Sequence, residues 1–139
     1  MTCGIFFRNR VLYKNIVLWI GLPGSGKTYC ANKFCDVVVD DITDLDQLPR
    51  DEELGIFDIG ITDVNFCDEF ILGFAYKKLK LMYPTRAIYL HYFENDPEQC
   101  RANVVYRDDG RNVEGTINRF SEIYNPPASA EKVWKEGDT

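Results

Sequence analysis

The segment Gly21–Thr28 constrains the fold of this chain more than any other part of the sequence. It reads Gly-Leu-Pro-Gly-Ser-Gly-Lys-Thr and matches the pattern G-x-x-x-x-G-K-[ST], whose glycines let several backbone N–H groups point at one anion. The apolar run Asn15–Ile20 precedes it, and apolar residues at helical spacing follow it between Lys27 and Cys35. Because a loop between a buried strand and a helix N-terminus binds phosphate, the segment predicts a nucleoside triphosphate site.

Each position of this loop has an expected role. The positions that should surround the phosphates are Gly21, Pro23, Gly24, Ser25 and Gly26. Lys27 should bridge the β- and γ-phosphates, and the Thr28 hydroxyl should ligate Mg²⁺. We therefore expect ATP as the nucleotide and Mg²⁺ as the metal.

Predicted strands alternate with predicted helices along the chain. The strands are 15–20, 36–39, 54–57 and 87–93, and the helices begin near residues 27, 64, 97 and 113. This alternation predicts an α/β fold, a three-layer domain with a small, roughly four-stranded parallel sheet. At 139 residues the chain has the length of one domain. We expect an N-terminal extension at 1–14, a lid region at about 96–120 and a tail at 128–139.

Charge and cysteine content narrow the classes of function. The formal net charge is −6, and residues 36–69 hold twelve acidic residues against one basic residue, which argues against generic, charge-driven binding of nucleic acid. The five cysteines and single histidine lack the spacing of a structural zinc site, and unpaired cysteines suit a reducing compartment. No apolar run approaches the roughly 18 residues of a membrane span. We expect a cytoplasmic protein without a membrane segment.

Phosphate-loop proteins divide into switches, motors and kinases. A GTPase would usually carry N-K-x-D, whereas the one Asn-Lys pair, Asn32-Lys33, lies inside the first predicted helix and continues Phe-Cys. A motor-type ATPase would usually have Asp-Glu at the end of an apolar strand, whereas Asp58 is followed by Ile59. The kinase type, which moves phosphate to a bound hydroxyl under an arginine-bearing lid, is what remains.

At this level of detail the chain resembles the phage-type polynucleotide 5′-kinase family. The resemblance rests on the phosphate loop, on the pair Asp40-Asp41 at the end of the second predicted strand, and on the arginine-containing segment from Arg101 to Arg119. It covers roughly residues 15–125 and implies a four-stranded parallel sheet. It further implies that Asp40 is the general base for the acceptor 5′-hydroxyl and that Arg107 is the lid arginine.

Residue type and expected position also indicate roles for several side chains, independently of the resemblance. Asp40 would lie in the crevice at the carboxyl ends of the strands, where it can accept a proton from a hydroxyl, and Asp41 is the alternative base. Asp58, also expected at a strand end, is a candidate to hold Mg²⁺-bound water or a substrate group. Arg101 and Arg111 are further candidates to stabilise the charge of the transferred phosphate.

The acceptor stays open at this stage. In the family an arginine three residues past the catalytic aspartate binds the acceptor's 3′-phosphate, and here that position is Thr43. The leading prediction is an ATP- and Mg²⁺-dependent kinase that phosphorylates a hydroxyl, first of all the 5′-hydroxyl of a polynucleotide. The alternatives are a kinase for a nucleoside, nucleotide or other small metabolite, and a non-catalytic module that binds ATP and a partner. The oligomeric state is not predicted.

Overall fold

A parallel sheet with the strand order β3–β4–β2–β5–β6 forms the centre of the molecule. The computed structural model describes residues 3–4, 15–41, 45–46, 48–55, 57–107 and 113–135. The strands are β2 (Asn15–Ile20), β3 (Val37–Val39), β4 (Ile59–Thr62), β5 (Ala87–Tyr92) and β6 (Glu131–Lys132). Because β2 pairs in parallel with β4 on one side and β5 on the other, the loop that follows β2 lies over the middle of the sheet.

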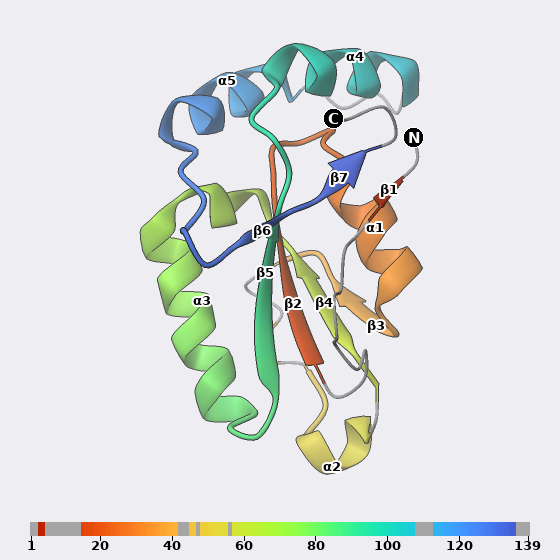
Figure 1. Cartoon of the computed structure of the whole chain (residues 1–139), viewed down its shortest axis with the longest axis vertical. Coiled ribbons are helices and arrows are strands. Elements are labelled where there is room, and N and C mark those ends of the chain that lie inside the picture. The colour runs from red at the N-terminus through yellow and green to blue at the C-terminus, as the bar shows by residue number, and fades with distance from the viewer. Residues whose placement is uncertain are drawn as a thin grey trace.

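The two faces of β2 pack against different helices. Ile16 and Leu18 belong to a buried cluster that includes residues of α3 (Glu69–Met82). Val17 and Trp19 point to the other face, where they pack with residues of α1 (Lys27–Phe34). All six residues of β2 are buried, as expected for a central strand covered on both faces. Figure 1 shows the resulting layers, with α1 and α3 on opposite sides of the sheet.

The remaining helices lie at the two ends of the strands. Helices α4 (Pro97–Arg107) and α5 (Glu114–Ile123) cross the carboxyl ends of the strands, at the top of Figure 1, and the short α2 (Asp51–Leu54) lies at the opposite end. A 3-10 turn, η2 (Val64–Cys67), leads from β4 into α3. Apart from the main sheet, β1 (Cys3–Gly4) pairs antiparallel with β7 (Trp134–Lys135). Within the described ranges no helix is long and apolar enough to cross a bilayer.

The prediction of a strand at 54–57 is wrong. Residues 51–54 form α2, whose first turn is acidic and so suits the positive end of a helix, and Gly55 follows with a φ of 57°. The strand is β4, four residues that are all buried, and it begins only at Ile59. Phe57 is half exposed and precedes the strand, so it does not enter the sheet.

The α/β class and the parallel sheet are confirmed, with five strands rather than four. The fifth strand, β6, comes from the tail and pairs with the last two residues of β5. The Val133 N–H donates to the Tyr92 carbonyl at 2.8 Å, and the Val133 side chain is buried beside Trp19 and Phe93. A two-residue strand is too short to leave a periodic pattern, which is why no pattern of residues predicted it.

The expectation that all five cysteines are unpaired is also wrong. Cys30 is disulfide-bonded, whereas Cys35, Cys67 and Cys100 are free. The free cysteines are buried or half-buried, where they act as small apolar side chains.

Candidate phosphate-binding and transfer site

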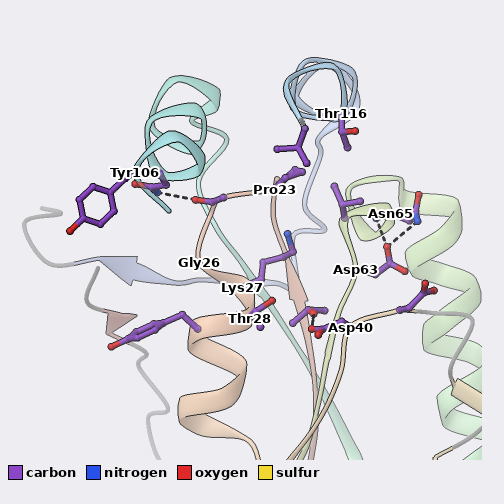
Figure 2. A pocket seen from close by; sticks show the side chains of 16 residues that line it. Pro23, Gly26, Lys27, Thr28, Asp40, Asp63, Asn65, Tyr106 and Thr116 are labelled. Atoms are coloured by element: carbon purple, nitrogen blue, oxygen red, sulfur yellow. Dashed lines mark hydrogen bonds between the residues drawn. The ribbon is translucent and has the colours of Figure 1, made fainter. Parts of the chain in front are cut away.

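A cavity of about 700 Å³ opens at the carboxyl ends of β2, β3 and β4. Residues of the phosphate loop form its floor, and α4, η2 and the start of α5 contribute to its walls (Figure 2). The elements meet here because all strands are parallel, so every strand-ending loop reaches the same edge of the sheet. A cavity of this size accommodates a nucleotide-sized ligand.

The phosphate loop has the backbone geometry that its glycines predict. Gly24 and Gly26 have φ values of 83° and 104°, in the left-handed region that favours glycine. The Ser25 hydroxyl is 1% exposed and has no hydrogen-bond partner in the described part of the chain. Ser25 does not line the cavity, so the fit of this loop to an anion rests on the backbone at Gly24 and Gly26.

The side chains that follow the loop lie at the cavity. Lys27 and Thr28 both line it, and α1 begins at Lys27. In this structure the Lys27 ammonium donates to the Leu22 carbonyl at 3.0 Å. A phosphate oxygen is charged and would be a stronger acceptor than this carbonyl. Pro23, Gly24 and Gly26 line the same cavity, whereas Gly21 is buried beneath the loop.

Asp40 and Asp41 follow β3 and line the cavity on the side toward η2. The Thr62 hydroxyl donates to Asp40 Oδ1 at 2.6 Å, which fixes the orientation of this carboxylate. Thr62 is buried at the end of β4, whereas Asp40 and Asp41 are exposed. The geometry therefore brings Asp40 and Lys27 to one cavity, as the sequence led us to expect (Figure 2).

The aspartate at the carboxyl end of β4 is Asp63, which the sequence reasoning missed. Asp63 is buried at 7% exposure and lines the cavity, and its Oδ1 accepts the Asn65 backbone N–H at 2.8 Å and the Asn65 side-chain amide at 2.9 Å. The available signal was the alternation Ile59-Gly60-Ile61-Thr62 before Asp63, which reads as a short buried strand ending in an acid.

Asp58 lies at the opposite end of β4, so its assignment to the metal site is a correction. It precedes the first residue of the strand and is not among the residues that line the cavity. Its Oδ1 accepts the Asn15 backbone N–H at 3.0 Å, and its own N–H donates to Asp36 Oδ2 at 2.8 Å. Asp58 joins the beginnings of β2 and β4, because the strand starts at Ile59, five residues later than the predicted start at residue 54.

The three candidate arginines have different positions. Arg101 points to α5, where it donates to Asn118 Oδ1 and lies 3.9 Å from a Glu114 carboxylate oxygen, and it does not line the cavity. Arg107 is the last residue of α4, at the cavity end of that helix, and its side chain lies outside the described part. Arg111 also lies outside the described residues.

Helix α4 packs directly on the phosphate loop through contacts that no sequence pattern indicated. The Asn103 side-chain amide donates to the Gly24 carbonyl at 2.8 Å and accepts from Gln99 at 2.9 Å. A Cβ at Gly24 would lie 2.5 Å from the Cys100 carbonyl oxygen. The close approach of α4 thus gives Gly24 a second reason to be glycine.

A buried thiol lies close to the loop but has no nucleophilic character. Burial raises the pKa of Cys67 to about 12, although nearby Lys27 and a hydrogen bond from the Gly21 backbone lower it in part. The group is a neutral thiol at physiological pH, and the thiolate is the nucleophilic form of cysteine. Cys67 therefore contributes packing beside Leu22 and Ile117.

Sequence comparison gives a relative but no family for this chain. The sequence matches no model of a known protein family. It is 29% identical over 128 residues to the uncharacterized protein R277 of Acanthamoeba polyphaga mimivirus, a match that covers 81% of this chain and 87% of the relative.

Two solved structures share the architecture. A gluconokinase from Sinorhizobium meliloti 1021 superposes with a TM-score of 0.55 at 11% identity, covering 86% of this chain and 81% of the other. The protein APE1195 superposes with a TM-score of 0.57 at 17% identity, covering 93% and 89%. With its glycine loop between β2 and α1 and its five-stranded parallel sheet, the chain has the α/β P-loop NTPase fold, the architecture that it shares with these two structures.

Proposed function

We propose that this protein is an ATP- and Mg²⁺-dependent kinase that transfers the γ-phosphate to a hydroxyl group. The observation that carries the proposal is the cavity itself, because it brings the oriented carboxylate of Asp40 to the same space as Lys27 and Thr28. A phosphate site without an adjacent base would suit simple nucleotide binding. A phosphate site with a base at the end of the neighbouring strand suits transfer to a bound hydroxyl.

The residues present fit a magnesium ion. Mg²⁺ takes one or two protein oxygens and fills its other positions with water and phosphate, so a cluster of three acidic ligands is not required. The Thr28 hydroxyl and the Asp63 carboxylate, both lining the cavity, are the groups that would hold it. The ion would neutralise charge on the β- and γ-phosphates.

The chain's own residues would divide the remaining work. Asp40, oriented by Thr62, would accept the proton of the acceptor hydroxyl as the hydroxyl oxygen bonds to the γ-phosphorus. The bond between the γ-phosphorus and the oxygen of the β-phosphate would break, and ADP would leave. Lys27 would exchange the Leu22 carbonyl for phosphate oxygens and stabilise the negative charge that develops on the transferred group. Arg107 would add a second positive charge from the end of α4, with Arg111 in the following segment as a further candidate.

The charge of the cavity favours a small, uncharged, hydroxyl-bearing acceptor such as a polyol, sugar or nucleoside. Asp40, Asp41 and Asp63 lie on the acceptor side, and Lys27 is the only basic side chain among the described residues that line the cavity. An acceptor that carries its own phosphates would face repulsion there.

The 5′-hydroxyl of a polynucleotide is the second candidate acceptor. Asp40 and Asp41 are exposed, so the end of a long chain can reach them as readily as a small molecule can. The resemblance to the phage-type polynucleotide 5′-kinases points the same way. In that family an arginine contacts the acceptor's 3′-phosphate, and the matching residue here is Thr43, which lies outside the described residues.

Transfer of label from γ-labelled ATP to a panel of acceptors tests the proposal. The panel should contain neutral polyols and sugars, nucleosides, and 5′-hydroxyl DNA and RNA oligonucleotides. Replacing Lys27 with Ala or Asp40 with Asn should lower the rate of transfer about 10²- to 10³-fold, as loss of a transition-state contact does in other enzymes. Asp41→Asn distinguishes the two possible bases.

Asp46→Asn is the matched control, since this carboxylate is 78% exposed and pairs with Lys78 away from the cavity. Its rate should equal that of the wild type. ATP binding with no transfer to any acceptor would favour the non-catalytic alternative, and an unchanged rate in Lys27→Ala would place the chemistry elsewhere.

A further inference from the structure

Two aromatic side chains line the cavity beside the phosphate loop, and the transfer chemistry described above uses neither. Tyr29 lies in the first turn of α1, directly after Thr28, and its residue surface is 49% exposed. Tyr106 lies near the end of α4 and is 90% exposed. Both line the same cavity although they come from different helices, α1 and α4. A large exposed ring at the edge of a cavity is available to a planar ligand.

A triphosphate bound with its γ-phosphate at Asp40 would have its base on the side of the loop where Tyr29 and Tyr106 lie. The transferred phosphate must lie where Lys27 and Asp40 meet, on the side of the cavity that carries Asp63 and Asn65 (Figure 2). The nucleoside then extends away from these carboxylates. Tyr106 lies on that opposite side of the loop in Figure 2, and Tyr29 follows the residues expected to hold the phosphates and metal.

Among the described residues near the two rings, few side chains are available to form hydrogen bonds with the edge of a base. Apart from the tyrosines, the described lining residues that come from the loop, α1 and α4 are Pro23, Gly24, Gly26, Lys27, Thr28 and Asn103. Lys27 is assigned to the phosphates. Thr28 is assigned to the metal, and the Asn103 amide is engaged at both ends, with the Gly24 carbonyl and with Gln99. Stacking on an aromatic face, by contrast, is available to every base and tolerates changes in its edge.

We propose that Tyr29 and Tyr106 hold the base of the donor nucleotide by stacking, so that the site accepts ATP and GTP with little discrimination. This inference rests on the proposed function, since it names the base site of the same triphosphate cavity. It makes the two rings responsible for affinity toward the nucleoside, whereas the phosphate loop and the groups around it hold the phosphates.

Calorimetric titration with Mg-ATP, Mg-GTP and inorganic tripolyphosphate separates the two contributions. Tyr29→Ala and Tyr106→Ala should each weaken the binding of ATP and GTP about 5- to 150-fold, which is the range of base–aromatic stacking, and leave tripolyphosphate affinity unchanged. Tyr106→Phe, which keeps the ring and removes the hydroxyl, should bind ATP within about twofold of the wild type. Wild-type affinities for ATP and GTP should differ by less than about fivefold.

Val105→Ala is the matched control, because Val105 is 77% exposed on the same helix and does not line the cavity. Both alanine variants binding ATP like the wild type would overturn the inference. So would an equal loss for ATP and tripolyphosphate, or a preference of 100-fold or more for one purine. If the wild type binds neither tripolyphosphate nor any nucleotide, the proposed function fails, and the base site fails with it.

Discussion

At the scale of single residues, two aspartates on either side of β4 differ in where their side chains lie. Asp58 directly precedes the strand and accepts the Asn15 N–H, whereas Asp63 directly follows the strand and lines the cavity. Because the strand is extended, the two carboxylates lie at opposite edges of the sheet. Only the one at the carboxyl edge can reach a bound phosphate or metal.

We expect Asp63→Asn to lower Mg²⁺-dependent phosphate transfer about 10- to 100-fold, because an amide is a poorer partner for a hydrated magnesium ion than a carboxylate. Asp58→Asn should leave transfer near the wild-type rate. Initial rates over a magnesium titration measure the effect. A wild-type magnesium dependence in Asp63→Asn would remove this residue from the metal site.

Asp58 should instead affect the dependence of stability on pH. Burial raises the pKa of Asp58 above its ordinary value of 3.8, with Asp36 adding to the rise and the Asn15 N–H opposing it. The folded state therefore holds this proton to a higher pH than the unfolded chain does. Since the folded state binds more protons in that window, the contribution of Asp58 to stability falls as the pH rises through it.

Urea unfolding from below pH 3.8 to neutrality measures this effect in the wild type and in Asp58→Asn. The asparagine can still accept the Asn15 N–H but does not ionise. The stability of the wild type relative to the variant should therefore fall across the window and stay constant above it. A difference that is constant at every pH would mean that the carboxyl titrates alike in both states.

At the scale of elements, the contact between α4 and the phosphate loop decides the geometry of the site. Asn103 donates to the Gly24 carbonyl, and Arg107 follows one helical turn later. The position of α4 on the loop therefore sets where the end of this helix lies relative to the transferred phosphate. Asn103 is in this sense a positioning residue.

Replacing Asn103 with Leu should lower kcat about 3- to 10-fold, the equivalent of one hydrogen bond, with a smaller change in the affinity for tripolyphosphate. Gln99→Leu is the comparison variant, since it removes a contact to Asn103 and leaves the bond to Gly24 in place. Steady-state kinetics with the best acceptor distinguish the two. An equal loss of kcat in both variants would indicate that the hydrogen bond from Asn103 to the Gly24 carbonyl does not affect the rate of transfer.

At the scale of the whole molecule, the two ends of the sheet serve different purposes. The carboxyl end carries the cavity, and the amino end carries a buried guanidinium. Arg86 is 2% exposed and donates to Asp51 Oδ1 at 2.5 Å, to the Phe57 carbonyl at 2.7 Å and to the Gly55 carbonyl at 2.7 Å. It joins the start of β5 to α2 and to the segment that leads into β4.

We expect Arg86→Met to lower the free energy of unfolding by about 2–4 kcal/mol, because two backbone carbonyls and a carboxylate lose their donor. Nucleotide affinity of the folded fraction should be unchanged, since Arg86 lies at the far end of the strands. Chemical denaturation and nucleotide titration give the two values. Lys78→Met, which removes an exposed pair with Asp46, should cost less than about 1 kcal/mol.

Local patterns were sufficient to predict much of this fold. The strands at 15–20, 36–39 and 87–93 are confirmed to within one residue, and so is the helix that follows the loop. Each is a run whose burial or amphipathicity is visible in its own residues. The third strand was misplaced because Leu54–Phe57 is as apolar as β4, and only packing determines which of them enters the sheet.

The sequence by itself determined the phosphate loop, the parallel α/β class and the acidic end of β3, because each depends on residues that are neighbours in the chain. Tertiary structure alone decided that Asp63 rather than Asp58 faces the cavity, that Thr62 orients Asp40, and that Asn103 meets Gly24. The last two contacts join residues 22 and 79 positions apart. A pattern of burial along one segment cannot specify such pairs, since they depend on how strands and helices align with one another in space.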